Sequence, residues 1–208
     1  MKIVSHSVRL FHATQNPEQV IEQAGRLCWK SEDKITETSH VAFIKMLMEP
    51  GRKHESVLEH ASAGFIITTD RGISHELVRH RIASYSQSST RYCNYGSGKF
   101  GNEITVVQPW ELSNTSPGYT PWKAACLEAE LGYLQMLADG EKPQIARSVL
   151  PTCLMTEVAM SANLREWRHF LSLRLSKAAH PDMRVVARLI AAELRLIAPT
   201  VIEDFSNF

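Results

Sequence analysis

The sequence predicts one domain of the mixed α/β class, with more helix than strand. Asn16-Pro17 predicts an N-cap followed by proline at the first helical position, and Thr120-Pro121 predicts the start of a long helix. The short run Phe65–Thr69 is rich in β-branched residues and predicts a strand. Strands and helices do not alternate as repeated βαβ units, which argues against a doubly wound parallel sheet.

Two helices are predicted near the start of the chain. The helix that begins at Pro17 carries an apolar stripe at helical spacing, formed by Val20, Ala24, Leu27 and Cys28. A second helix is predicted from Val41 to Met48. Pro50-Gly51 is expected to end it, because proline and glycine interrupt helices.

The centre of the chain predicts a turn, a helix and a second strand. Asp70-Arg71-Gly72 predicts the turn, and Ser74 is expected to cap a helix that reaches Arg81. Glu103–Gln108 predicts the strand. The long helix that begins at Thr120-Pro121 is expected to end near Asp139-Gly140.

The last third of the chain predicts three helices and one further strand. A short helix follows Pro143 and is ended by Pro151, and residues 153–161 predict a strand. Asn163 is expected to cap a helix through about Leu175, whose apolar side is formed by Leu164, Trp167 and Leu171. Pro181-Asp182 predicts the start of the last helix.

Composition indicates an ordinary globular protein with a balanced charge. The 208 residues are 44% hydrophobic and 22% charged, with a formal net charge of +1, which argues against a nucleic-acid partner. No apolar run approaches the roughly 20 residues of a membrane span, and the start has no apolar signal segment. The four cysteines form no C-x-x-C pair, so we expect reduced thiols, a cytoplasmic location and no metal site. We expect Cys153, in an apolar setting, to be a core residue.

The segment from Arg79 to Tyr92 holds the densest cluster of anion-binding side chains. Arg-His-Arg begins it, and Arg91 follows after a run rich in hydroxyl groups. Guanidinium and hydroxyl groups are the donors that bind phosphate and carboxylate. Taken alone, the cluster is equally compatible with a solvated basic surface.

A second polar cluster extends from His54 to His60. The two histidines are six residues apart, so they diverge by roughly 240° on a helix and do not form the zinc motif H-E-x-x-H. Ser56 and Glu59 have the spacing of a capping box. The alternative is a polar floor for a ligand.

The third cluster lies in the C-terminal half. Arg147 precedes Asn163-x-Arg165-x-x-x-His169, and Arg174 follows. Arg165 and His169 are four residues apart and share a helix face. Arg174 lies nine residues after Arg165, on roughly the opposite face.

These three clusters, in this order and spacing, resemble the flavin-dependent thymidylate synthases (the ThyX family). The resemblance implies a single domain over residues 1–208, with helices around a small, mostly antiparallel sheet. It also implies reductive methylation of dUMP to dTMP, with methylenetetrahydrofolate as carbon donor and FAD, reduced by NADPH, as hydride donor. A homotetramer with active sites at subunit interfaces is expected.

The resemblance assigns expected roles to individual residues, with Arg174 as the catalytic group and His54 as a weaker candidate on the folate side. The expected FAD contacts are Ser56, Arg79, His80, Arg81, Gln87, Asn163, Arg165 and His169. The expected dUMP contacts are Glu76, Arg79, Gln87, Ser88, Ser89, Thr90, Arg91, Arg147 and Arg174.

Two alternatives stay open at this point. One keeps the fold and the flavin but makes the protein a pyrimidine hydroxymethylase, and the other is a non-catalytic binder of nucleotides or RNA. The neutral pair Gln87-Ser88 stands where relatives often have a glutamate, so the rate or the preferred pyrimidine is open. Ser89 is not expected to be a nucleophile, because no adjacent base is visible to activate it.

Overall fold

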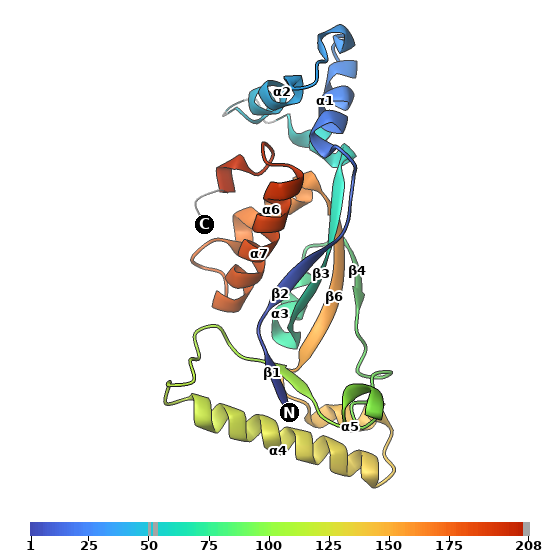
Figure 1. Cartoon of the computed structure of the whole chain (residues 1–208), viewed down its shortest axis with the longest axis vertical. Coiled ribbons are helices and arrows are strands. Elements are labelled where there is room, and N and C mark those ends of the chain that lie inside the picture. Colours follow the sequence, from blue (N-terminus) through green and yellow to red (C-terminus); the bar gives the residue numbers. More distant parts are fainter. Residues whose placement is uncertain (50, 52–53, 206–208) are drawn as a thin grey trace. The chain divides into compact units, whose positions relative to one another are not determined.

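The computed structural model describes residues 1–49, 51 and 54–205. The chain divides into two compact units, and Figure 1 traces its course. Unit 1 consists of Met1–Ser7, Ile67–Arg79 and Ser86–Val158. Unit 2 consists of Val8–Ile66, His80–Tyr85 and Ala159–Phe208.

The main sheet has four strands in the order β2-β3-β6-β4. Their bounds are Ser7–Ala13, Ser62–Asp70, Met155–Asn163 and Ser84–Gln87, respectively. The main-chain bonds Thr14 N–H to Ser62 C=O and Leu164 N–H to Ala61 C=O join the end of one strand to the start of the next, as in antiparallel pairs. The prediction of a mixed fold around a small antiparallel sheet is confirmed.

Unit 1 contains helices α3 (Arg71–Leu77), α4 (Tyr119–Ala138) and α5 (Pro143–Ala146). It also contains a separate parallel pair, β1 (Lys2–Val4) with β5 (Thr105–Val107). Its core is a cluster of Ile104, Val106, Cys126, Tyr133, Ala146 and Leu154. Cys153 is half-buried against this cluster, with its sulfur 3.4 Å from that of Cys126.

Unit 2 contains helices α1 (Pro17–Leu27), α2 (Ser39–Met48), α6 (Leu164–Arg174) and α7 (Pro181–Ile197). Helices α6 and α7 lie side by side (Figure 1). Trp167 is fully buried, packs edge-on against Phe65 with ring centroids 5.1 Å apart, and donates its indole N–H to the Ala63 carbonyl at 2.9 Å. This indole therefore joins α6 to strand β3.

The apolar stripe predicted on α1 is wrong. Leu27 and Cys28 are exposed, whereas Ile21 and Gly25 are buried. The reason is the close approach of α2, because a Cβ on Gly25 would lie 2.6 Å from the Phe43 ring. The packing partner, rather than the apolar spacing, decides which face of α1 is buried.

The predicted start and end of α3 are also wrong. The cap is Asp70, whose carboxylate accepts the Ile73 N–H at 2.8 Å, and Ser74 lies inside the helix. The helix ends at Leu77. The Arg-His-Arg segment that begins at Arg79 therefore follows the helix instead of lying on it.

Most of the other predicted element boundaries agree with the structure within two or three residues. Asn163 caps α6 as predicted, and Pro181 opens α7. Helix α2 ends at Met48, and Pro50, predicted to end it, lies outside the described residues. None of the helices within the described ranges is both long and apolar enough to cross a membrane.

Asp70→Ala is expected to lower the free energy of unfolding by about 1 kcal/mol, because it removes the cap of α3 and leaves the Ile73 N–H without its acceptor. Urea denaturation would measure the change. Asp70→Asn keeps a capping oxygen and should cost clearly less. Equal losses in both variants would contradict the role of the cap.

Candidate functional site

The predicted site residues fall into two groups, one in each unit. Unit 1 holds the expected dUMP contacts apart from Arg174, and unit 2 holds the expected FAD contacts apart from Arg79 and Gln87. Arg79 follows α3 and is exposed, and its main-chain N–H donates to the Glu76 carbonyl at 3.2 Å. Glu76 itself lies on α3.

In unit 1, a network of hydroxyl and amide groups holds the start of the predicted dUMP segment. The Gln87 side-chain amide donates to the hydroxyls of Ser74 and Thr156, at 3.0 Å each. Ser88 and Thr156 share a hydroxyl bond of 2.9 Å. The amide orientation of Gln87 is therefore set by α3 on one side and by β6 on the other.

The next part of the segment brings a guanidinium group to a buried hydroxyl. Arg147 Nη1 donates to the Thr90 hydroxyl at 3.2 Å, although these residues are 57 positions apart. Arg91 is exposed, and its main-chain N–H donates to the Ser89 hydroxyl at 3.3 Å. Two exposed guanidinium groups and a row of hydroxyls form an arrangement that suits a phosphate.

In unit 2, a cavity of about 750 Å³ opens along α6. Three predicted FAD contacts line it, namely Asn163, Arg165 and His169. Within the described residues, His54, Ser56, His80 and Arg81 lie outside its lining. Its other walls are Glu55, Glu59, Ile82, Glu166, Arg168, Ser172, Asp204 and Phe205.

The Arg165 guanidinium lies among acidic side chains. Its Nη1 is 2.5 Å from the Glu59 carboxylate, and its Nε is 4.0 Å from that of Glu55. Side chains of Arg165 and Glu59 are each nearly half exposed, and ion pairs of this kind contribute little stability. Arg165 can therefore exchange Glu59 for an anionic ligand at small cost.

The capping box predicted from Ser56 and Glu59 does not form. Both residues lie inside a short 3₁₀ helix, Glu55–His60, whose N-cap position is His54 rather than Ser56. Glu59 is paired with Arg165 instead. His54 is exposed and contacts Trp29 edge-on, with ring centroids 6.5 Å apart.

His80 is the buried centre of the second arrangement in unit 2. Arg174 Nε donates to His80 Nε2 at 3.0 Å, and a Glu166 carboxylate oxygen lies 3.4 Å from His80 Nδ1. Burial first, and then the neighbouring positive charges of Arg174 and His169, lower the pKa of His80 from 6.5 to about 4. A neutral ring also fits this geometry, because Nε2 must accept the bond from Arg174.

Two weakly acidic side chains, the half-buried Tyr85 and the buried Glu166, lie beside His80. The Tyr85 hydroxyl donates to the His80 carbonyl at 2.7 Å, and burial, followed by the nearby Glu166 charge, raises the pKa of Tyr85 to about 12. Burial also raises the pKa of Glu166, although His169 opposes that shift.

His80, Glu166 and His169 have ligand atoms within 4.8 Å of one another, so a metal ion must be considered. Arg174 already donates to one nitrogen of His80 and Glu166 lies beside the other. A cation bound there would replace the hydrogen bond from Arg174 to His80 and would be repelled by the positive charge of Arg174. The donor set therefore fits a metal poorly.

Glu55 and Glu59, which belong to the segment predicted as a polar floor, line the cavity, whereas sequence reasoning missed Glu166, Tyr85 and Asp204. Asn163-x-x-Glu166 has the spacing of an N-terminal cap, and this signal identifies Glu166: the Asn163 side chain accepts the Glu166 N–H at 2.8 Å. Glu59 is 106 positions from Arg165, and no local pattern indicates that pairing.

We expect the His80 ring to stay neutral down to about pH 5. Because the pKa of His80 is lowered in the folded state, only the unfolded chain binds a proton at this residue between pH 6.5 and 4. The contribution of neutral His80 to the free energy of unfolding is therefore fully present above pH 6.5 and is lost as the pH falls toward 4. NMR titration of the imidazole would measure the pKa.

Urea denaturation at pH 7 and pH 5 would measure the effect of His80 on stability, with His80→Gln as the variant without this titration. The wild type should lose more stability than the variant between these values. A midpoint near 6.5 in the NMR titration would contradict the burial argument.

Comparisons with known proteins agree over nearly the whole chain. The family model described as thymidylate synthase complementing protein matches residues 9–200. The chain is 34% identical over 204 residues to the flavin-dependent thymidylate synthase of Geobacter sulfurreducens, covering 95% of this chain and 85% of that protein. It is 33% identical over 209 residues to that of Corynebacterium glutamicum, covering 92% and 80%, respectively.

A solved structure matches the fold across the same length. The UMP/dUMP methylase PolB from Streptomyces cacaoi, crystallised with 5-Br dUMP, superposes with a TM-score of 0.81 and 25% identity, covering 100% of this chain and 98% of that one. The chain belongs to the thymidylate synthase complementing protein family, whose members include the flavin-dependent thymidylate synthases that its motifs predicted.

Proposed function

We propose that this protein converts dUMP to dTMP by reductive methylation. Methylenetetrahydrofolate would supply the carbon, and FAD reduced by NADPH would supply the hydride. The observation that carries the proposal is the family membership over residues 9–200 together with the hydroxyl and guanidinium segment of unit 1. The same membership favours an enzyme over a non-catalytic binder of nucleotides or RNA.

The dUMP phosphate is assigned to the guanidinium groups of Arg91 and Arg147 and the hydroxyl of Ser89. A nucleotide monophosphate is nearly a dianion, and guanidinium forks bind it with two bonds each. Arg147 is already oriented by Thr90, which supports this role. Glu76, Arg79, Gln87, Ser88 and Thr90 are the remaining proposed dUMP contacts.

Arg174 is assigned to the pyrimidine. A fixed positive charge there would stabilise negative charge that develops on the ring and make C5 a better nucleophile. The hydrogen bond from Arg174 to the neutral His80 supports this role, because a buried acceptor fixes the orientation of the guanidinium.

FAD fits the cavity of unit 2 in size and in donor set. Its volume of about 750 Å³ lies within the usual range for cofactor sites, and Arg165 offers an exposed guanidinium for a phosphate. Asn163, Arg165 and His169 would hold the cofactor, which when bound supplies hydride transfer. Ser56, Arg79, His80, Arg81 and Gln87 stay proposed contacts, and His54 is proposed for the folate side.

The wider assignments belong to the same proposal. We expect the whole chain to act as one domain of the family, in a homotetramer located in the cytoplasm, without a metal ion and without a nucleic-acid partner. The family resemblance and the balanced charge of +1 support these assignments.

A second candidate is methylation of UMP as well as dUMP. PolB, the solved relative, is named a UMP/dUMP methylase, and the neutral Gln87-Ser88 pair lies in the proposed pyrimidine region. Hydroxymethylation would give a product with one more oxygen. Product mass from UMP, dUMP and dCMP with the folate donor separates these reactions.

The first experiment is the absorbance spectrum of the purified protein, followed by tritium release from 5-tritiated dUMP with NADPH and the folate donor. We expect a yellow protein and turnover that depends on FAD. A colourless protein that gains no thermal stability from added FAD would contradict the proposal.

Arg174→Ala is expected to lower turnover of dUMP at least about a hundredfold, as loss of a preorganised charge does, while FAD affinity changes little. Arg165→Ala should instead weaken FAD binding by about tenfold, and its loss of dUMP turnover should follow from that weaker binding. Arg188→Ala, an exposed position on α7, is the matched control. Near-normal turnover in Arg174→Ala would refute its assigned role.

A further inference from the structure

The last described residues of the chain form one wall of the unit 2 cavity. We define residues 200–205 as the C-terminal segment. Asp204 and Phe205 line the cavity together with Arg165 and His169 of α6. The family model matches only through residue 200, so nearly all of this wall lies outside the matched region.

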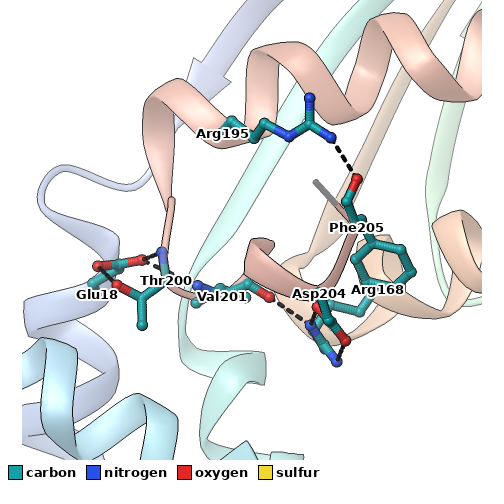
Figure 2. A network of polar contacts seen from close by, with 7 residues as sticks. All are labelled: Glu18, Arg168, Arg195, Thr200, Val201, Asp204 and Phe205. Atoms are coloured by element: carbon teal, nitrogen blue, oxygen red, sulfur yellow. Dashed lines mark hydrogen bonds and ion pairs between the residues drawn. The ribbon is translucent and has the colours of Figure 1, made fainter. Parts of the chain in front are cut away.

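Buried and charged side chains hold the segment in place (Figure 2). The Glu18 carboxylate, 6% exposed, accepts the Thr200 N–H at 2.6 Å, the Thr200 hydroxyl at 2.9 Å and the Val201 N–H at 3.2 Å. At the other end, Arg195 of α7 donates to the Phe205 carbonyl. The main chain of the segment is therefore fixed at both ends.

Arg168 joins the segment to α6 in its middle. Its two terminal nitrogens bind the two Asp204 carboxylate oxygens at 2.6 and 2.7 Å, and Nη1 also donates to the Val201 carbonyl at 2.5 Å. The same guanidinium lies over the Phe205 ring, 5.2 Å from its centre. A two-bond fork fixes orientation as well as distance, so Arg168 positions both wall residues.

The Arg168–Asp204 pair also sets the charge of the cavity. The lining contains four carboxylates, from Glu55, Glu59, Glu166 and Asp204, and two arginines. Among the described lining residues, Arg168 is 12% exposed and held by Asp204, whereas Arg165 is 49% exposed and paired with the exposed Glu59, which an anionic ligand can replace. A cavity with one such exchangeable guanidinium and several acceptor carboxylates suits a ligand with few negative charges and many hydroxyl or amino donors.

These features distinguish the two halves of FAD. The adenylate half has ribose hydroxyls and an adenine amino group that carboxylates accept, and a phosphate that Arg165 binds. The isoalloxazine half gains negative charge when it is reduced, and neighbouring carboxylates would oppose that charge. The lining therefore favours the adenylate half.

We propose that Asp204 and Phe205, positioned by Arg168, are specificity determinants for the adenylate half of a flavin dinucleotide. Phe205, a ring that is 8% exposed and lies beneath Arg168, supplies its exposed edge to the adenine, and Asp204 holds Arg168 in a two-bond fork. This inference rests on the proposed flavin function. It adds a selective element contributed by the C-terminal segment.

The test compares the affinities of the full-length protein for FAD and for FMN, which lacks the adenylate half, by titration of flavin fluorescence. Phe205→Ala and Asp204→Ala should each weaken FAD binding by about tenfold and leave FMN binding within about twofold. Phe205→Tyr keeps the ring and should retain the wild-type FAD affinity.

The matched control is Glu203→Gln in the same segment. Glu203 pairs with Lys45 at 2.9 Å and lines two other cavities but not this one, so this variant should bind both flavins as the wild type does. Circular dichroism and Tm would show that each variant folds. Asp204→Asn, which keeps the size of the side chain, replaces Asp204→Ala if the latter does not fold.

Each outcome decides one question. Unchanged FAD affinity in the folded variants, or equal losses for FAD and FMN, overturns the assignment of the adenylate half to this wall. A wild-type protein that binds neither flavin overturns the proposed function itself, and with it this inference.

Discussion

The junction between strand β6 and helix α6, at Asn163, is the constraint on which the unit 2 site depends. The Asn163 side chain caps the helix by accepting the Glu166 N–H, and the next residue, Leu164, bonds to the Ala61 carbonyl. The start of α6 is therefore fixed to the sheet. Because a helix advances by 3.6 residues per turn, this single anchor determines where Arg165, Glu166 and Arg174 lie.

Electrostatic balance, rather than net positive charge, characterises the unit 2 site. The cavity contains acids paired with arginines, and the adjacent cluster contains a neutral imidazole beside a guanidinium. Such an arrangement binds an anion only by exchange of partners, as at Arg165. Ligand charge and hydrogen-bond pattern then matter more than attraction at long range, which suits a small cofactor better than a polyanion.

Local signals predicted the parts of the fold that depend on neighbours in sequence. The cap at Asn163 and the proline at the first position of α7, Pro181, are such signals, since a capping side chain reaches only two or three residues along the chain and proline fixes the backbone at its own position. The predicted apolar stripe of α1 failed because its outcome depends on a distant partner, Phe43, which buries Gly25. The cap predicted at Ser74 failed because Asp70, four residues earlier, caps α3 and leaves Ser74 inside the helix.

The sequence by itself determined the family, the mixed fold class and the residue types that can bind a nucleotide. The physical reason is that these properties depend on the order and spacing of motifs along the chain. Only the tertiary structure decided the partners of those residues. Arg165 pairs with Glu59, Arg174 donates to a neutral His80, and the C-terminal segment forms one wall of the cavity. Such contacts join residues many tens of positions apart, and burial, which sets their charge states, exists only once the chain has folded.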